Sequence, residues 1–269
     1  MAYVTRKPGI HAVVRWVRSV TAHCWTFSNR VNQCAAPPTT RGDRCASHRP
    51  HPSPASFSLK EYALEAGNQG AVGSCVAWAT GYTGIGLLAK EQGKTGYPFA
   101  PMFVYAQIAQ GDDTGTWAGV ALPIEEEQGI DTKEHYWQGD FDYTTQPDED
   151  EIANAANYKI TGFTDLTDAP DREEAVKEAI ASGLPVPIGF ELRSSFEDLD
   201  SSNYTYDPSE GEEVLGGHEV TIIGYDEEGV EIENSWGSDW GNEGYFKAPW
   251  SFITGSDVDE IHSIGKLAG

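Results

Sequence analysis

Gln69-Gly70-Ala71-Val72-Gly73-Ser74-Cys75 is the most informative segment of this 269-residue chain, because it leads a glycine-rich turn into a cysteine. Far downstream stand Gly217-His218 and the run Asn234-Ser235-Trp236-Gly237. A cysteine nucleophile needs an imidazole beside it, a group that fixes the imidazole tautomer, and donors for the developing oxyanion. The pattern therefore predicts a thiol-dependent acyl-transfer site made by four residues: Cys75, His218, Asn234 and Gln69.

These segments resemble the signatures of the papain-like cysteine peptidases, which read Q-G-x-C-G-S-C-W, H-A-V and N-S-W-G. Here they read QGAVGSCVAW, GGHEVTIIGY and ENSWGSDWGNEGYF. Gln69 precedes Cys75 by six residues, His218 follows Cys75 by 143, and Asn234 follows His218 by 16, close to the order and separations of the family. The resemblance covers residues 57–269 and is greatest to bacterial and viral members.

Four positions depart from the family pattern without removing a catalytic atom. Val72 stands where the family has the first cysteine of its C-G-S-C run, and the partner cysteine is missing too, so we expect no disulfide in this loop. Val76 replaces the aromatic residue after the nucleophile, and Glu219 replaces the small residue after the histidine. We expect the chemistry to survive and the shape of the substrate pocket to change.

The resemblance implies an α+β fold of two lobes with the active-site cleft between them. A helical lobe is expected over about residues 57–160, and a β-rich, barrel-like lobe over about residues 161–269. If Cys75 opens a helix, the helix dipole and His218 would both lower the thiol pKa and give a thiolate and imidazolium pair.

The resemblance also implies roles for the other candidates. Asn234 would accept a hydrogen bond from the imidazole of His218, and Trp236 would shield that bond from water. The side-chain amide of Gln69, with the backbone N–H of Cys75, would form the oxyanion hole. Gly115, in the run Asp113–Trp117, would offer backbone hydrogen bonds to an extended substrate, and Trp236 is the second residue expected to bind substrate.

Each candidate also has an ordinary interpretation. A lone cysteine on a buried helix is usually an inert small hydrophobe, His218 can be a core histidine, and Gln69 can belong to a surface turn. The joint presence of the four residues at family spacing favours the site. On a strand His218 and Val220 share a face, so we expect Glu219 to point away from the cleft.

Charge is distributed unevenly along the chain. Residues 1–56 hold eight Arg or Lys and one Asp, which leaves ten basic and 41 acidic residues over 57–269, a net charge of −31. Such a surface disfavours nucleic acid and anionic membranes, favours basic peptides, and suits a high-salt setting. With 39% hydrophobic residues the chain can bury a sizeable core.

Residues 1–56 predict a basic, disordered leader rich in Arg, Pro, His and Ser, without the helical periodicity of an inhibitory pro-segment. Translation from a downstream start is an alternative. This segment contains His48, His51 and three of the four cysteines, which are Cys24, Cys34 and Cys45. Their spacings are too irregular to predict a metal site. No signal peptide or membrane-spanning run is predicted, and Cys75 alone cannot form a disulfide within the body, so a cytoplasmic location is favoured.

Secondary-structure signals change from helix to strand along the chain, which is typical of α+β proteins. Helices are predicted from Cys75 to a stop at Gly93, from Pro101 to Ile108, and from Asp171 to Ile180. Four strands are predicted: Leu184–Phe190, His218–Tyr225, Val230–Trp236 and Tyr245–Lys247.

The sequence thus predicts a monomeric cysteine peptidase acting on polypeptides, with no metal or organic cofactor. Cys75 would attack a peptide carbonyl, His218 would protonate the leaving amine, and water would hydrolyse the thioester. One alternative is an acyl transferase or amide hydrolase, since the same residues do not dictate the acceptor. Another is a non-catalytic peptide-binding relic, although such a protein would normally have lost one of these residues.

Overall fold

The computed structural model describes residues 53–269, so nearly all of the predicted leader lies outside the described residues. The helices, including the short 3-10 helices η1 and η3 and the π-helix η2, are η1 (Lys60–Tyr62), α1 (Cys75–Ala77), η2 (Trp78–Ile85), α2 (Gly86–Glu91), α3 (Pro101–Ala109), α4 (Ala118–Glu127), α5 (Glu149–Ala155), α6 (Arg172–Ala181), η3 (Ser194–Asp198) and α7 (Trp250–Ile253). The strands are β1 (Phe57–Ser58), β2 (Phe163–Asp165), β3 (Val186–Arg193), β4 (Val214–Tyr225), β5 (Gly229–Glu233), β6 (Tyr245–Pro249) and β7 (Val258–Ile264).

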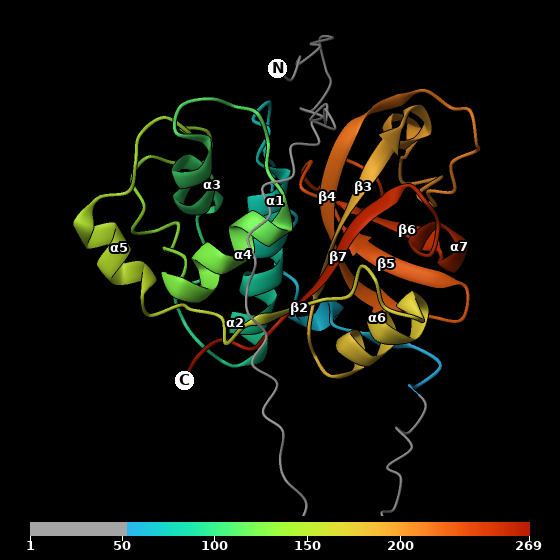
Figure 1. Cartoon of the computed structure of the whole chain (residues 1–269), viewed down its shortest axis with the longest axis horizontal. Coiled ribbons are helices and arrows are strands. Elements are labelled where there is room, and N and C mark those ends of the chain that lie inside the picture. Colours follow the sequence, from blue (N-terminus) through green and yellow to red (C-terminus); the bar gives the residue numbers. More distant parts are fainter. Residues whose placement is uncertain (1–52) are drawn as a thin grey trace, which may run out of the picture. The chain divides into compact units, whose positions relative to one another are not determined.

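The strands form one sheet in the order β2-β7-β3-β4-β5-β6, with β1 added against β4, and neighbouring strands are antiparallel. Figure 1 shows this sheet on one side of the molecule and helices α3, α4 and α5 on the other, with α1 between them. The predicted α+β class is confirmed.

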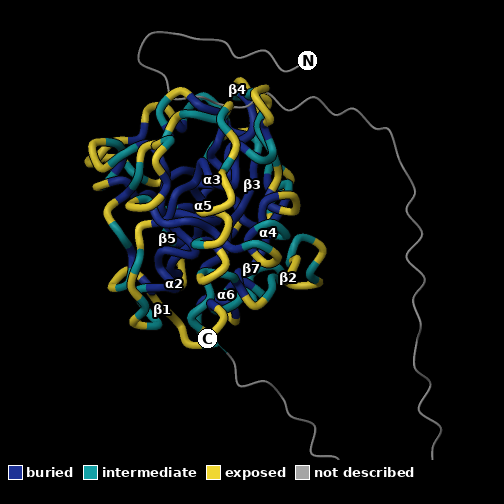
Figure 2. Tube along the Cα trace, turned by 90° about the vertical axis from the view of Figure 1, so that its left-hand side faces the viewer, coloured by how far each residue is buried: buried dark blue, intermediate teal, exposed yellow. Residues whose placement is uncertain are grey.

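The protein has two hydrophobic cores, one against the sheet and one among the helices of the other lobe. Figure 2 shows that the buried segments lie in the interior of the molecule. The chain crosses between the two cores at both ends of the described region. Leu59 and Ala63, near the start, pack into the sheet core, whereas Ile264 and Leu267, near the end, pack into the helical core. These crossings tie the two lobes together.

The central helix runs without a break from Cys75 to Glu91 through α1, η2 and α2. Gly93 follows with φ +64°, a conformation that suits glycine at a helix end. Glycines within the helix allow close packing: a Cβ on Gly81 would lie 2.4 Å from Ile130 Cδ1, and one on Gly84 would lie 2.5 Å from Ile264 Cδ1. The predicted helix is confirmed, and the π-helical middle is a feature that propensity did not indicate.

Predicted elements elsewhere are confirmed with shifted bounds. Helix α3 begins at Pro101, and α6 begins after Asp171, whose side chain accepts the backbone N–H of Glu174. Strand β4 starts four residues before His218, and β5 ends at Glu233, so Asn234 follows the strand instead of lying within it. Helices α4, α5 and α7 and strands β1, β2 and β7 were not predicted.

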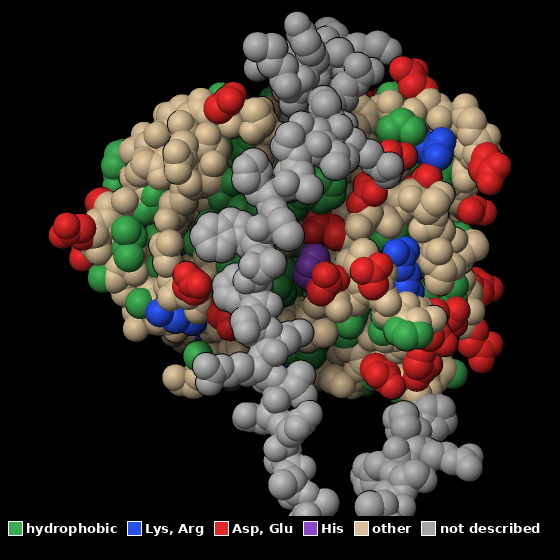
Figure 3. Space-filling model, in the orientation of Figure 1, with side chains coloured by type: hydrophobic (Ala, Val, Ile, Leu, Met, Phe, Trp, Pro, Cys, Tyr) green, Lys and Arg blue, Asp and Glu red, His purple; other side chains and the backbone are tan. Residues whose placement is uncertain are grey.

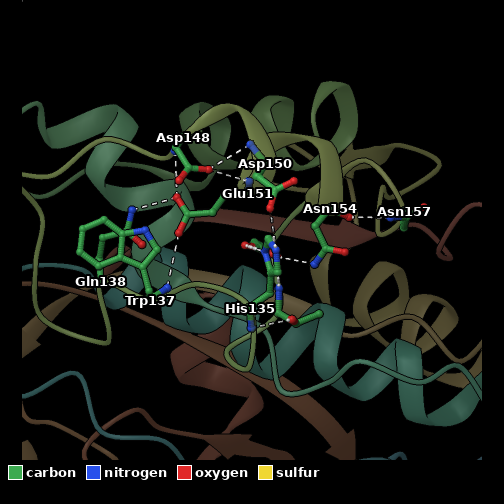
Figure 4. A network of polar contacts seen from close by, with 10 residues as sticks. His135, Trp137, Gln138, Asp148, Asp150, Glu151, Asn154 and Asn157 are labelled. Carbon is green, nitrogen blue, oxygen red and sulfur yellow. Dashed lines mark hydrogen bonds and ion pairs between the residues drawn. The ribbon is translucent and has the colours of Figure 1, made fainter.

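Helix α5 begins at a capping box, in which Asp148 accepts the N–H of Glu151 and Glu151 accepts the N–H of Asp148. A polar network around it fixes the segment before it (Figure 4). Asp131, which is fully buried, accepts from Asn154 Nδ2 at 2.6 Å and contacts His135 Nδ1 at 2.9 Å. The helical lobe is therefore closed at this edge by hydrogen bonds as well as by apolar packing.

Two buried carboxyl groups flank η2. Glu125 accepts a hydrogen bond from Thr80 Oγ1 at 2.7 Å, and Glu233 accepts one from Thr83 Oγ1 at 3.1 Å. Burial raises the pKa of Glu125 to about 8 and that of Glu233 to about 8, although the threonine bonds oppose the shift. Both groups are therefore protonated over much of the acidic and neutral range.

We expect the protein to lose stability as pH rises from 5 to 8. The folded-state pKa values of Glu125 and Glu233 exceed the unfolded value of 4.5, so the stability they contribute is complete below that value and is lost as pH rises toward 8. The loss is on the order of a few kcal/mol, or about 10 °C in the thermal midpoint. Calorimetry at low and high salt separates this loss of stability from the effect of repulsion between surface charges, because salt screens only the surface charges.

The double variant Glu125→Gln, Glu233→Gln is the matched control, because each amide keeps the oxygen that accepts the threonine hydroxyl and cannot ionise. Its midpoint should fall by less over the same pH range, and the fall that remains includes the contribution of the other buried carboxyl groups whose pKa is raised, Glu219 and Glu260. An equal decline in the variant and the original chain would contradict the assignment to these two groups.

Candidate active site

Cys75 is the first residue of α1 and is 1% exposed. Its sulfur interacts with the backbone N–H of Glu219, the residue after His218, and with the N–H groups of Val76 and of Cys75 itself. Helix α1 therefore places the thiol next to β4, the strand that contains His218. Two of the residues predicted from the sequence, 143 positions apart, are brought to one place.

The surroundings of Cys75 differ from the expectation in one respect. Burial, and to a smaller extent the negative charge of Glu219, raise the pKa of the Cys75 thiol to about 12, although three backbone N–H groups lower it. The backbone N–H groups of Glu219, Val76 and Cys75 lower the pKa, but desolvation outweighs them. Desolvation therefore opposes the thiolate and imidazolium pair that the sequence predicts.

His218 and Asn234 form the predicted pair. His218 Nε2 lies 2.8 Å from Asn234 Oδ1, and the backbone N–H of Ser235 also donates to this oxygen at 2.8 Å. A backbone donor requires an oxygen at that position, which fixes the orientation of the amide. The Nε2 atom of His218 consequently carries the hydrogen, and Nδ1 is the nitrogen able to exchange a proton when the ring is neutral.

Aromatic rings surround the imidazole of His218. The ring of Trp236 lies 5.1 Å away at 35°, and those of Phe196 and Phe190 lie at 5.8 and 6.0 Å with near-perpendicular planes. His218 is itself fully buried. Burial and these rings keep water from the bond between His218 and Asn234.

Gln69 is fully buried and is held by a residue that sequence reasoning did not single out, Ser235. The Ser235 hydroxyl donates to Gln69 Oε1 at 2.7 Å, and the Gln69 backbone N–H donates to Ser235 O at 2.9 Å. Gln69 Nε2 donates to Val72 O at 3.0 Å. An amide nitrogen has two hydrogens, so one remains for a further acceptor. The segment containing Asn234 therefore positions Gln69 as well as His218.

Two buried carboxyl groups meet beside this site. Gly189 of β3 pairs with Glu219 of β4 on one side and with Glu260 of β7 on the other. A Cβ on Gly189 would lie 2.5 Å from Glu219 Oε2 and 2.9 Å from Glu260 Cγ, so the glycine provides the space in which the two side chains converge. Burial raises the pKa of both carboxyl groups, and the charge of Glu260 raises that of Glu219 further.

Glu219 was expected to point away from the cleft. Its side chain is on the opposite face of β4 from Val220, as strand alternation requires, but it is fully buried and its charge acts on Cys75. Glu260 was missed, because its partner lies 41 residues away in a non-adjacent strand. Figure 3 shows other Asp and Glu side chains spread over the sheet side of the surface.

Gly115 lies in the loop between α3 and α4 and has φ +74°. Its backbone N–H donates to Tyr105 Oη at 3.1 Å, so this group is already used within the protein. Of its two backbone polar groups, the carbonyl is thus the better candidate for contact with a substrate.

The arrangement of these residues agrees with comparisons against known proteins. Residues 54–252 match the family model described as papain family cysteine protease. The chain belongs to this family. An uncharacterised peptidase C1-like protein of Acanthamoeba polyphaga mimivirus is 28% identical over 211 residues, which cover 73% of this chain and 68% of that protein. Mouse procathepsin L is 28% identical over 191 residues, covering 67% of this chain and 55% of the relative.

Solved structures of papain-like proteases show the same fold. Xylellain, a cysteine protease from Xylella fastidiosa, superposes with a TM-score of 0.70 at 23% identity, covering 80% of this papain-family chain and 87% of xylellain. Bromelain from Ananas comosus, solved with an inhibitor, gives a TM-score of 0.62 at 19% identity, covering 79% and 99% of the two chains. Within residues 53–269, no helix is both long enough and apolar enough to cross a membrane.

Proposed function

We propose that this chain is a cysteine peptidase that hydrolyses peptide bonds through Cys75, His218 and Asn234. The observation that carries the proposal is the 2.8 Å contact between His218 Nε2 and Asn234 Oδ1, because it orients the imidazole on the strand whose next residue, Glu219, lies close enough to Cys75 to influence the pKa of its thiol. An oriented imidazole beside a thiol is the arrangement required for nucleophilic acyl transfer.

Each step follows from a group already described. As the Cys75 sulfur bonds to the peptide carbonyl carbon, its proton passes to His218 Nδ1, so a separated thiolate does not have to persist in a buried site. The Cys75 backbone N–H and the remaining hydrogen of Gln69 Nε2 stabilise the carbonyl oxygen as it gains negative charge. The C–N bond then breaks, His218 gives its proton to the leaving amine, and a thioester remains.

Water completes the reaction. His218 takes a proton from the water as its oxygen adds to the thioester carbon, the C–S bond breaks, and the Cys75 thiol is restored with release of a carboxylic acid. These steps use protein groups and water. Polypeptides are accordingly the proposed substrates, and the proposed protein is a monomer located in the cytoplasm, with residues 57–269 as the peptidase domain.

A peptide-library digest in heavy-oxygen water tests the reaction type. For a peptidase, mass spectrometry should find new carboxyl termini that carry the heavy isotope. An added amine or amino acid serves as a competing acceptor, because a transferase would join the acyl group to it and leave the isotope out. Products dominated by amine adducts would replace the proposal with acyl transfer, and intact peptides with every acceptor would indicate a peptide-binding protein.

A further inference from the structure

One carboxylate ties the loop between α3 and α4 to the segment before Cys75. Asp113 Oδ1 accepts the backbone N–H of Gly73 at 2.9 Å and the hydroxyl of Tyr105 at 2.6 Å. Asp113 and Gly73 are 40 residues apart in the chain. Because Gly73 lies two residues before Cys75, this oxygen acts on the backbone that leads into the candidate nucleophile.

Tyr105 extends the connection to Gly115. The Tyr105 hydroxyl donates to Asp113 and accepts the backbone N–H of Gly115 at 3.1 Å. Tyr105 is fully buried in α3, and burial followed by the neighbouring Asp113 raises its pKa, which keeps the hydroxyl protonated and able to donate. A continuous series of hydrogen bonds therefore joins the segment before the nucleophile to the loop that contains Gly115.

Among the described residues, no covalent cross-link can join the segment before Cys75 to the loop that contains Gly115. Cys75 is the single cysteine between positions 53 and 269, so a disulfide cannot join the two segments. Gly73 and Gly115 have no side chains with which to fix their own positions. The side chains of Asp113 and Tyr105 supply the directional bonds between the two backbones.

We propose that Asp113 is a positioning residue for the reaction at Cys75. Its carboxylate holds the backbone before the nucleophile and, through Tyr105, holds Gly115 in register with it. The role rests on the proposed peptidase function, since it concerns the alignment of nucleophile and substrate. Misplacement of a reacting atom by about 1 Å can cost roughly 100-fold in rate, so two hydrogen bonds at this point have a large effect.

The geometry makes different predictions for three variants. Both bonds go to the same oxygen, Oδ1, so Asp113→Asn can keep them with its amide oxygen and should retain kcat within about threefold. Asp113→Ala removes both bonds and should lower kcat by about 10- to 100-fold. Tyr105→Phe removes the hydroxyl's bonds to Asp113 and Gly115 but leaves the bond from Gly73 to Asp113, so it should raise KM with a smaller effect on kcat than Asp113→Ala.

The experiment uses the full chain and a peptide cleaved in the library digest. Active sites are titrated with an irreversible thiol reagent, and kcat and KM are expressed per titrated site. Alkylation of Cys75 by iodoacetamide is followed separately across pH by mass spectrometry of the peptide containing Cys75, because this readout does not require turnover. In Asp113→Ala the rate of alkylation at each pH should fall, since the sulfur loses its fixed relation to the groups that stabilise its anion, and Asp113→Asn should leave the rate unchanged.

Several results would overturn the positioning role. A lower thermal midpoint in Asp113→Ala, with kcat per titrated site and the alkylation profile unchanged, would show that Asp113 only stabilises the fold. If Asp113→Ala does not fold, Tyr105→Phe decides: an unchanged KM refutes the connection to Gly115, and a raised KM supports it. An original chain that cleaves no peptide refutes the proposed function instead, and the alkylation profiles then still decide the role of Asp113.

Discussion

Replacing Cys75 with alanine is expected to abolish peptide hydrolysis. The variant lacks the sulfur that attacks the carbonyl carbon, and neither His218 nor Gln69 can form the thioester in its place. We expect kcat/KM to fall by about 10⁴-fold or more, as is usual when the nucleophile of a coupled set is removed. Steady-state hydrolysis of a fluorogenic peptide, with product detection down to the uncatalysed rate, measures the loss.

The fold should survive this substitution. Cys75 is buried at the start of α1, and losing one sulfur atom leaves a small cavity worth about 1 kcal/mol or less. Calorimetry should find the thermal midpoint within a few degrees of the original. Alanine at Cys45, a cysteine outside the described residues, is the matched control and should leave turnover unchanged. Full activity in Cys75→Ala, or loss of activity in Cys45→Ala, would refute Cys75 as the nucleophile.

Replacing Gln69 with alanine is expected to lower kcat by about 10²- to 10³-fold, the usual cost of removing one oxyanion donor. The amide is fully buried and fixed by Ser235 and Val72, so its free hydrogen is preorganised for an acceptor. Because the bond strengthens as negative charge develops on the carbonyl oxygen, the loss should fall mainly on kcat and leave KM little changed. Steady-state kinetics per titrated site provides the measurement.

Two controls separate this role from a structural one. Ser235→Ala leaves the Gln69 amide in place but removes the hydroxyl that holds it, so its kcat should fall by less than that of Gln69→Ala. The thermal midpoints of the two variants report the cost of leaving a buried partner unsatisfied, about 1–3 kcal/mol. If Gln69→Ala loses stability but keeps its kcat, Gln69 is a packing residue and the oxyanion is stabilised elsewhere.

Helix and strand positions followed from signals that are local in the chain. Proline at the start of α3 and the aspartate cap before α6 act within one turn, and the predicted helices therefore appear with bounds close to those expected. Strands were predicted with less accurate ends, because pairing determines where a strand stops. The π-helical turns of η2 were not predictable, since they depend on packing against Glu125, Glu233 and the residues that crowd the glycines.

The resemblance carried by the segments around Cys75, His218 and Asn234 was sufficient, without any structure, to predict the α+β fold and the residues that the structure brings together. Residue type and spacing carry that information, because the chemistry restricts which side chains can serve. The folded chain alone decided the environment of those residues. Glu219 meets Glu260 only because β3 places Gly189 between their strands, and burial raises the pKa of Cys75, which the sequence had predicted to be lowered. Desolvation and strand pairing depend on many residues that are distant in the sequence, so they cannot be predicted from any local segment.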